Sequence, residues 1–116
     1  MHDDLIVIDG LQYSNWSREI FSQLREGGVS AVHATLVYHE NARETLGRLG
    51  EWNRRFEQHS DLIMPVVGAA DIRRAKELGK VGIFFGAQNC SPIEDDIGLI
   101  EVFRQLNLLI MQLTYN

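Results

Sequence analysis

The chain has one cysteine, two prolines and no long apolar run among its 116 residues. Because Cys90 is the only cysteine, no disulfide can form within one chain, which fits a reducing compartment. No apolar stretch reaches the roughly 18 residues needed to span a bilayer. Residues 1–20 also lack the basic start and apolar centre of a signal peptide. We therefore expect a cytoplasmic protein that does not enter the membrane.

Positive charge is also scarce. The formal net charge is -5, the pI is about 5.3, and Lys and Arg gather into nothing longer than the pairs Arg54-Arg55 and Arg73-Arg74. A nucleic-acid-binding protein needs a basic patch, so we expect no nucleic-acid partner. Hydrophobic residues make up 45% and charged residues 23% of the chain, as in a folded globular domain. With no linker or repeat, residues 1–116 are predicted to form a single domain.

Apolar segments alternate with segments of helical periodicity. Leu5 to Ile8 is a continuous apolar run closed by Asp9-Gly10, a pattern typical of a strand buried on both faces. Leu62 to Val67 is interrupted by Pro65, which predicts an edge strand or one that ends at the proline. A short helix is expected over 71–78. The main strands are predicted at about 5–9, 29–37, 81–86 and 108–114, and the main helices at 15–26, 42–58 and 95–106.

Two of these helices carry recognisable start signals. Asn41 with Glu44 three residues later has the spacing of a capping box. The acidic run 94–96 suits the positive N-terminus of the last helix, whose buried face is predicted to carry Ile100, Phe103 and Leu106. Strands that alternate with helices favour an α/β fold of parallel βα units. Pattern alone leaves open a small doubly wound domain or the first half of a (β/α)8 barrel of the TIM type.

Polar residues at the predicted strand ends are the candidates for a site, because parallel sheets place their chemistry there. Asp9 either caps the following turn or touches a ligand. Gln88 and Asn89 either bind a substrate through hydrogen bonds or satisfy loop backbone groups. We interpret Cys90 as an inert thiol, since no basic partner adjoins it in the sequence.

The histidines have similar alternatives. His33 lies in the middle of a predicted strand, where a hydrogen-bonded core histidine is more common than a ligand. His39 follows the same strand and stands beside Glu40, a better place for chemistry, although a loop histidine is the simpler interpretation.

Several motifs occur in an order that resembles one known family. They are Asp9-Gly10-Leu11-Gln12-Tyr13, Ile72-Arg73, Gly79-Lys80 before an apolar strand, Gly86-Ala87-Gln88, Ile97-Gly98-Leu99-Ile100 and Leu113-Thr114-Tyr115-Asn116. The family is that of the membrane (renal) dipeptidases, which are zinc peptidases, and the likeness extends over about 110 residues. It implies the N-terminal half of a (β/α)8 barrel.

The resemblance also implies a site of two zinc ions at the carboxyl ends of the barrel strands. In the family the first strand supplies a His and an Asp, a later strand supplies a Glu that bridges both metals, and the second half supplies the rest. Here those three positions fall on Leu11, Tyr13 and Gln88. Leucine offers no donor atom, and an amide compensates poorly for the repulsion of two dications about 3.5–4 Å apart. We therefore expect zinc to be absent or weakly bound.

Two functions follow from the resemblance and its departures. One is a dipeptidase-like metallohydrolase for dipeptides or small amides, of which this chain alone is inactive. The other is a non-catalytic relative that binds a small molecule or a partner subunit. A third possibility is an α/β domain with only an architectural likeness. Because an unfinished barrel leaves a strand edge open, we expect a homo-oligomer or an association with the remainder of a barrel.

Overall fold

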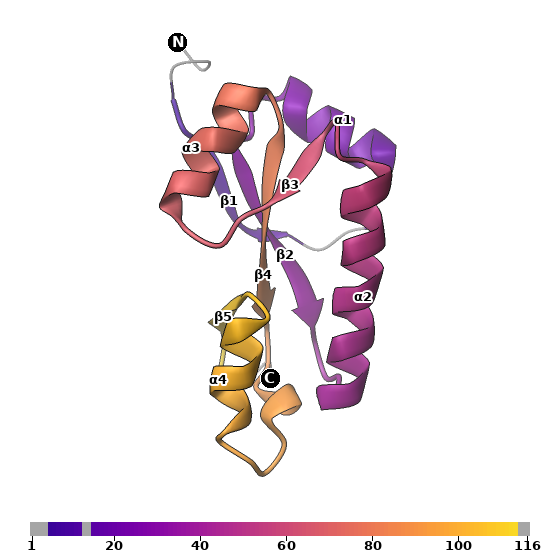
Figure 1. The fold of residues 1–116 in the computed structure, drawn as a ribbon, viewed down its shortest axis with the longest axis vertical. Helices are drawn as coiled ribbons and strands as arrows, with labels where there is room; N and C mark the ends of the chain where they lie inside the picture. The colour runs from indigo at the N-terminus through magenta and orange to yellow at the C-terminus, as the bar shows by residue number, and fades with distance from the viewer. Residues whose placement is uncertain (1–4, 13–14, 114–116) are drawn as a thin grey trace.

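The computed structural model describes residues 5–12 and 15–113, and in them parallel strands alternate with helices (Figure 1). The order predicted from the sequence is confirmed. The elements are β1 (Ile8–Gln12), α1 (Arg18–Glu26), β2 (Ala31–Val37), α2 (Ala42–Gln58), β3 (Ile63–Pro65), α3 (Ala69–Leu78), β4 (Val81–Ala87), the 3-10 turn η2 (Ser91–Ile93), α4 (Leu99–Gln105) and β5 (Leu108–Met111).

Strand β4 is the centre of the sheet. It pairs with β2 along one edge. Along the other edge, β3 pairs with the first part of β4 and β5 pairs with the last part of β4. Strand β1 pairs with the outer edge of β2, and all these pairings are parallel. The predicted adjacency of the four main strands is therefore confirmed. The short strand that ends at Pro65 lies at an edge, where a missing N–H is tolerated.

The two faces of β4 have different roles because successive side chains alternate. Phe85 packs against the rings of Trp52 and Phe56 from α2, so its face is covered by that helix. Residues of β2 and β4 on that face join Phe21 and Phe103 from the other helices in one buried cluster. The opposite face carries Phe84, stacked on His33 of β2. It is this second face that leads to the polar residues at the strand ends.

Local signals in the sequence define the helix ends. The predicted capping box is present, with the Glu44 N–H donating to Asn41 Oδ1 at 2.9 Å and the Asn41 N–H donating to Glu44 Oε1 at 3.1 Å. Ser17 caps α1 by accepting from the Ile20 N–H at 3.4 Å, so this helix starts three residues later than predicted. Gly79 ends α3 with φ of +70°, a conformation that glycine adopts without strain.

The prediction for the first strand is wrong in its limits and in its burial. Strand β1 starts at Ile8, and the side chains of Leu5, Ile6 and Ile8 are 58%, 45% and 49% exposed. Within the part of the chain that the structure describes, β1 has a neighbour only on the β2 side. An apolar run indicates that a segment is suited to burial, but whether it is buried depends on which other elements pack against it.

The last helix also differs from its prediction. It begins at Leu99 because the preceding acidic residues form a turn, in which Asp96 Oδ1 accepts from the Gly98 N–H at 2.9 Å. Glu94 instead accepts from the Ala42 N–H of α2 at 3.0 Å. Of the three residues expected on the buried face, Phe103 is 2% exposed, whereas Ile100 and Leu106 are 51% and 39% exposed. Phe103 is the one buried residue of α4, because a helix of seven residues makes only about two turns.

Strand β5 ends at Met111, earlier than the predicted end at 114, and position 114 lies outside the described residues. Strand β2 starts at Ala31, after Gly28 turns the chain with φ of +79°. The helices of the described residues are all too short or too polar to span a membrane.

Candidate functional site at the carboxyl ends of the strands

Polar residues from β2 and β4 meet where these strands end. Gln88 follows β4 directly, and its backbone N–H donates to the Val37 carbonyl of β2 at 2.9 Å. Its side-chain Nε2 donates to Thr35 Oγ1 at 3.0 Å, and both residues are 7% exposed. This bond joins residues 53 positions apart, so the carboxamide is held in one orientation between two adjacent strands.

The loops after the same two strands also meet. Asn89 Nδ2 lies 3.4 Å from His39 Nδ1, and both residues are more open to solvent than Gln88. The Ser91 hydroxyl donates to the Glu40 carbonyl at 2.7 Å, which ties η2 to the loop after β2. The structure thus brings together two of the residues proposed from the sequence, Gln88 and Asn89, with a third candidate, His39.

Glu40 stabilises its own loop. One carboxylate oxygen accepts from the backbone N–H groups of Tyr38 and His39, at 2.6 and 3.0 Å, and the other lies 3.3 Å from the Arg48 guanidinium. Partial burial raises the pKa of Glu40, but the backbone hydrogen bonds and Arg48 outweigh it, so the net effect lowers this pKa. Glu40 is therefore a carboxylate at neutral pH that contacts the His39 backbone.

Among the remaining candidates, the structure describes Asp9 and Cys90 in full. Asp9 sits inside β1, in register with Val32, because the strand continues past the predicted turn. Cys90 donates from Sγ to the Leu113 carbonyl at 3.0 Å and is half-buried. Tyr13 lies outside the described residues, as does the side chain of Leu11.

His33 is buried, as predicted, with 3% of its surface exposed. Its Nδ1 lies 2.7 Å from the Gly10 carbonyl, whereas Nε2 has no hydrogen-bond partner among the described residues. The prediction of a hydrogen-bonded core histidine is therefore confirmed for one ring nitrogen only.

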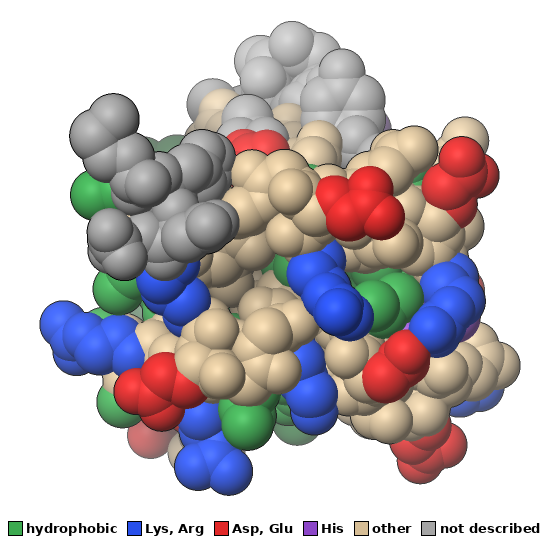
Figure 2. Space-filling view, turned by 90° about the horizontal axis from the view of Figure 1, so that it is seen from above, with side chains coloured by type: hydrophobic (Ala, Val, Ile, Leu, Met, Phe, Trp, Pro, Cys, Tyr) green, Lys and Arg blue, Asp and Glu red, His purple; other side chains and the backbone are tan. Residues whose placement is uncertain are grey.

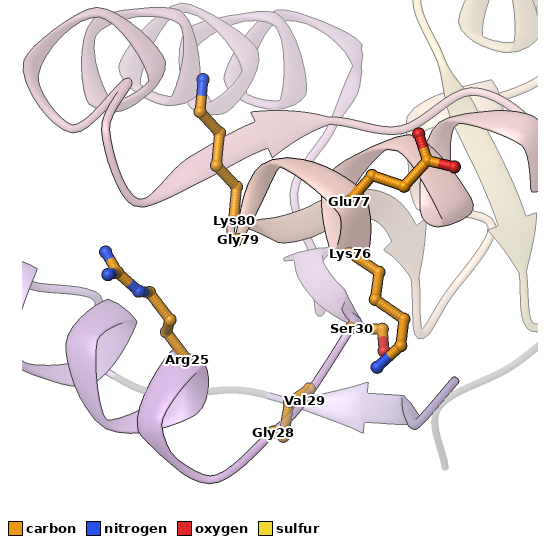
Figure 3. Close-up of a pocket in the computed structure, with 8 residues that line it drawn as sticks. All are labelled: Arg25, Gly28, Val29, Ser30, Lys76, Glu77, Gly79 and Lys80. Carbon is orange, nitrogen blue, oxygen red and sulfur yellow. The ribbon is translucent and has the colours of Figure 1, made fainter. Parts of the chain in front are cut away.

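A cluster of cations at the opposite end of the sheet was missed by the sequence reasoning. Arg25, Lys76 and Lys80 line a cavity of about 530 Å³ near the starts of β2 and β4 (Figure 3). Lys and Arg side chains are interspersed with acidic ones when the molecule is viewed from that end (Figure 2). Arg25 and Lys76 stand in the last turns of α1 and α3, where cations interact favourably with the helix dipole. The position of Arg25 and Lys76 near the ends of two predicted helices was the signal available in the sequence, and it favours a stabilising role for both residues.

The arrangement of strands and polar residues is that of one class of proteins, the TIM-barrel enzymes. Parallel βα units with a covered outer face and polar residues at the strand ends are the building plan of TIM-barrel enzymes. The sequence matches the membrane dipeptidase family, peptidase family M19, over residues 12–116. The chain therefore belongs to this family, which is a family of metallopeptidases.

Solved structures agree with this assignment. An amidohydrolase from Pseudomonas aeruginosa is 45% identical, with a TM-score of 0.97, over 99% of this chain and 35% of that one. The probable dipeptidase PvdM from the same organism is 11% identical, with a TM-score of 0.81, over 98% of this chain and 36% of that one. A metallopeptidase from Rhodobacter sphaeroides, liganded with a phosphinate mimic of L-Ala-D-Ala, is 11% identical, with a TM-score of 0.73, over 92% of this chain and 44% of that one.

The chain spans less than half the length of each of these structures. Of the two architectures that the sequence left open, the agreement selects the N-terminal part of a TIM barrel over a doubly wound domain. A search among curated proteins gave no match.

The donor atoms of the described residues do not form a site for a pair of zinc ions. The described residues contain no group of three or more His, Cys, Asp or Glu side chains that could hold a metal. At the end of β4 the available group is the neutral Gln88 carboxamide, which already donates to Thr35. A zinc site needs several nitrogen, sulfur or anionic oxygen donors around one point.

Proposed function

We propose that this chain is part of a dipeptidase-like barrel that binds a dipeptide or small amide at the carboxyl ends of β1, β2 and β4. We propose further that the 116-residue chain does not itself hydrolyse such substrates. Membership of the dipeptidase family supports the ligand class. The Rhodobacter sphaeroides structure supports it as well, since that protein is liganded with a phosphinate mimic of a dipeptide.

The proposal rests on the neutral carboxamide of Gln88 and its hydrogen bond to Thr35. By resemblance it takes the position of the carboxylate that bridges two zinc ions in the family. A carboxamide is neutral, and its one oxygen cannot offset the repulsion between two dications about 3.5–4 Å apart. After the bond from Nε2 to Thr35, the amide retains a carbonyl oxygen and a second N–H. Those two groups are complementary to a peptide bond, so they favour recognition of an amide over its hydrolysis.

A second function is favoured by the 45% identity to an amidohydrolase. In a complete barrel, donors from elements outside the described residues would supply the metal ligands, and Gln88 would orient the substrate amide. Both functions share a ligand class and differ in turnover. In both, the partner is the remainder of a barrel or a second copy of the chain, with no role for nucleic acid.

Zinc analysis tests the metal part of the proposal. After mild dialysis the purified chain should hold well under one zinc ion, because Leu11 supplies no donor and Gln88 only a neutral amide. Gln88→Glu alone should not produce zinc-dependent hydrolysis of L-Ala-D-Ala, since the first-strand donors are still missing. Two tightly held zinc ions per chain, or zinc-dependent turnover by the unmodified chain, would contradict it.

Calorimetric titration with L-Ala-D-Ala tests the ligand part. Gln88→Ala should weaken binding by about tenfold, the effect of losing a hydrogen bond worth roughly 1.4 kcal/mol. Gln58→Ala is the matched control, because Gln58 is an exposed residue at the end of α2. Equal binding by the two variants would remove Gln88 from the site.

A further inference from the structure

We propose that His33 is a positioning residue that fixes a β-bulge in β1 and so determines how the end of β1 enters the candidate site. The bulge is visible in the pairing of the two strands. Ile8 and Asp9 pair with Ala31 and Val32, but the next pair is Gln12 with Ala34. Three steps along β1 thus match two steps along β2, which is the two-against-one count of a bulge.

His33 lies opposite this irregular stretch. The Gly10 carbonyl falls between the paired positions of β1, and His33 Nδ1 approaches it to 2.7 Å. A carbonyl oxygen can only accept, so Nδ1 carries the proton and donates it. The imidazole therefore bonds to a carbonyl in the irregular part of the ladder.

The contacts of the His33 ring indicate that the hydrogen bond to Gly10 is the reason for a histidine at this position. The ring stacks on Phe84, with centroids 5.6 Å apart and an interplanar angle of 15°. A Cβ added at Gly86 would lie 1.8 Å from His33 Nε2, so the ring fits only because position 86 has no side chain. Nε2 is buried and has no partner among the described residues, an arrangement that disfavours a histidine kept merely for packing. An aliphatic side chain would fill the space without that loss.

The consequence for the site follows from strand geometry. Side chains alternate between faces, so one residue gained or lost in register turns every later side chain of β1 to the other face. The irregular stretch between Asp9 and Gln12 includes Leu11, which the family resemblance places at the first-strand ligand position. The bulge and its hydrogen bond do not depend on the proposed function. Only their effect on ligand binding rests on it.

Three replacements of His33 separate this role from simple packing. His33→Asn keeps an N–H near the place of Nδ1, whereas His33→Gln is closer in length to histidine and places its amide near Nε2. His33→Leu fills space with no donor. Amide hydrogen exchange of residues 8–12 should be about tenfold faster in the Gln and Leu variants than in the Asn variant. A packing role predicts the opposite order, with Leu and Gln the less perturbing changes.

Nitrogen NMR of the unmodified protein gives a test that needs no variant. Coupling patterns of the His33 ring should report the tautomer with the proton on Nδ1. A proton on Nε2 alone, or equal exchange rates in the Asn and Leu variants, would overturn the proposal. Titration with L-Ala-D-Ala is then informative about function. If exchange follows the expected order and no variant changes affinity, the bulge role stands and the proposed ligand site fails.

Discussion

The close approach of His33 to Gly86 yields a quantitative prediction for Gly86→Ala. The new Cβ would lie 1.8, 2.6 and 2.7 Å from Nε2, Cε1 and Cδ2 of His33. Real Cβ atoms do not approach other atoms so closely, so the imidazole must move. Because Nδ1 also holds the Gly10 carbonyl, a displaced ring loses that hydrogen bond.

The magnitude follows from three contributions. Overpacking in a well-packed core costs about 1–3 kcal/mol. Loss of the hydrogen bond adds about 0.5–1.5 kcal/mol. Removing a glycine from the unfolded chain offsets about 0.4–1 kcal/mol. We therefore expect Gly86→Ala to lower the free energy of unfolding by about 2 kcal/mol, measured by urea denaturation at constant m-value.

Two control experiments separate the clash with His33 from a general effect of replacing glycine. A Cβ added at Gly50, in α2, would meet nothing within 4 Å, so Gly50→Ala should stabilise the protein by about 0.5–1 kcal/mol. In a His33→Ala background the ring is absent, and Gly86→Ala should then have almost no destabilising effect. Additive free energies for the two substitutions would refute the argument, because residues in direct contact must show a coupling energy.

Two further predictions concern charge and assembly. The pKa of Asp61 is lowered to about 2 by its side-chain hydrogen bonds to Arg18, so this pair stabilises the fold above the ordinary pKa of 3.8 and loses that contribution as the pH falls toward 2. Unfolding midpoints from pH 5 to 2 should fall more steeply for the unmodified chain than for Asp61→Asn, and parallel profiles would contradict this. Burying about 500 Å² of open apolar surface favours association by roughly 12 kcal/mol before docking entropy is subtracted, so light scattering should report species larger than the 13.2 kDa chain. A monodisperse monomer at all dilutions would argue against an open barrel edge.

The order of elements could be predicted because it depends on local chemistry. The Asn41 and Glu44 side chains cap the helix that follows them wherever it packs. Pro65 cannot donate to a neighbouring strand, so a strand that contains it belongs at an edge. Burial was predicted less well. Ile8 and Ile110 are apolar strand residues, yet they are 49% and 44% exposed, since burial depends on which elements lie opposite.

The residues of the candidate site were also predicted only where local sequence was enough to indicate them. Gln88 was found from a motif, and its place at the end of a parallel strand followed from the predicted order of elements. Its partner Thr35 was not found, because a hydrogen bond between residues 53 positions apart depends on the register of β2 against β4. No pattern in the sequence reports register directly.

The bulge in β1 was also not predicted from the sequence. Asp9-Gly10 looks like a turn because both residue types favour turns, and the sequence reasoning ended the strand there. The same glycine instead lies in the irregular stretch of β1, with its carbonyl bonded to His33. Two residues far from each other in the sequence, His33 and Gly86, must then be compatible with that irregularity. The direction in which the first strand delivers its side chains to the site is therefore determined by the neighbouring strands as well as by the motif.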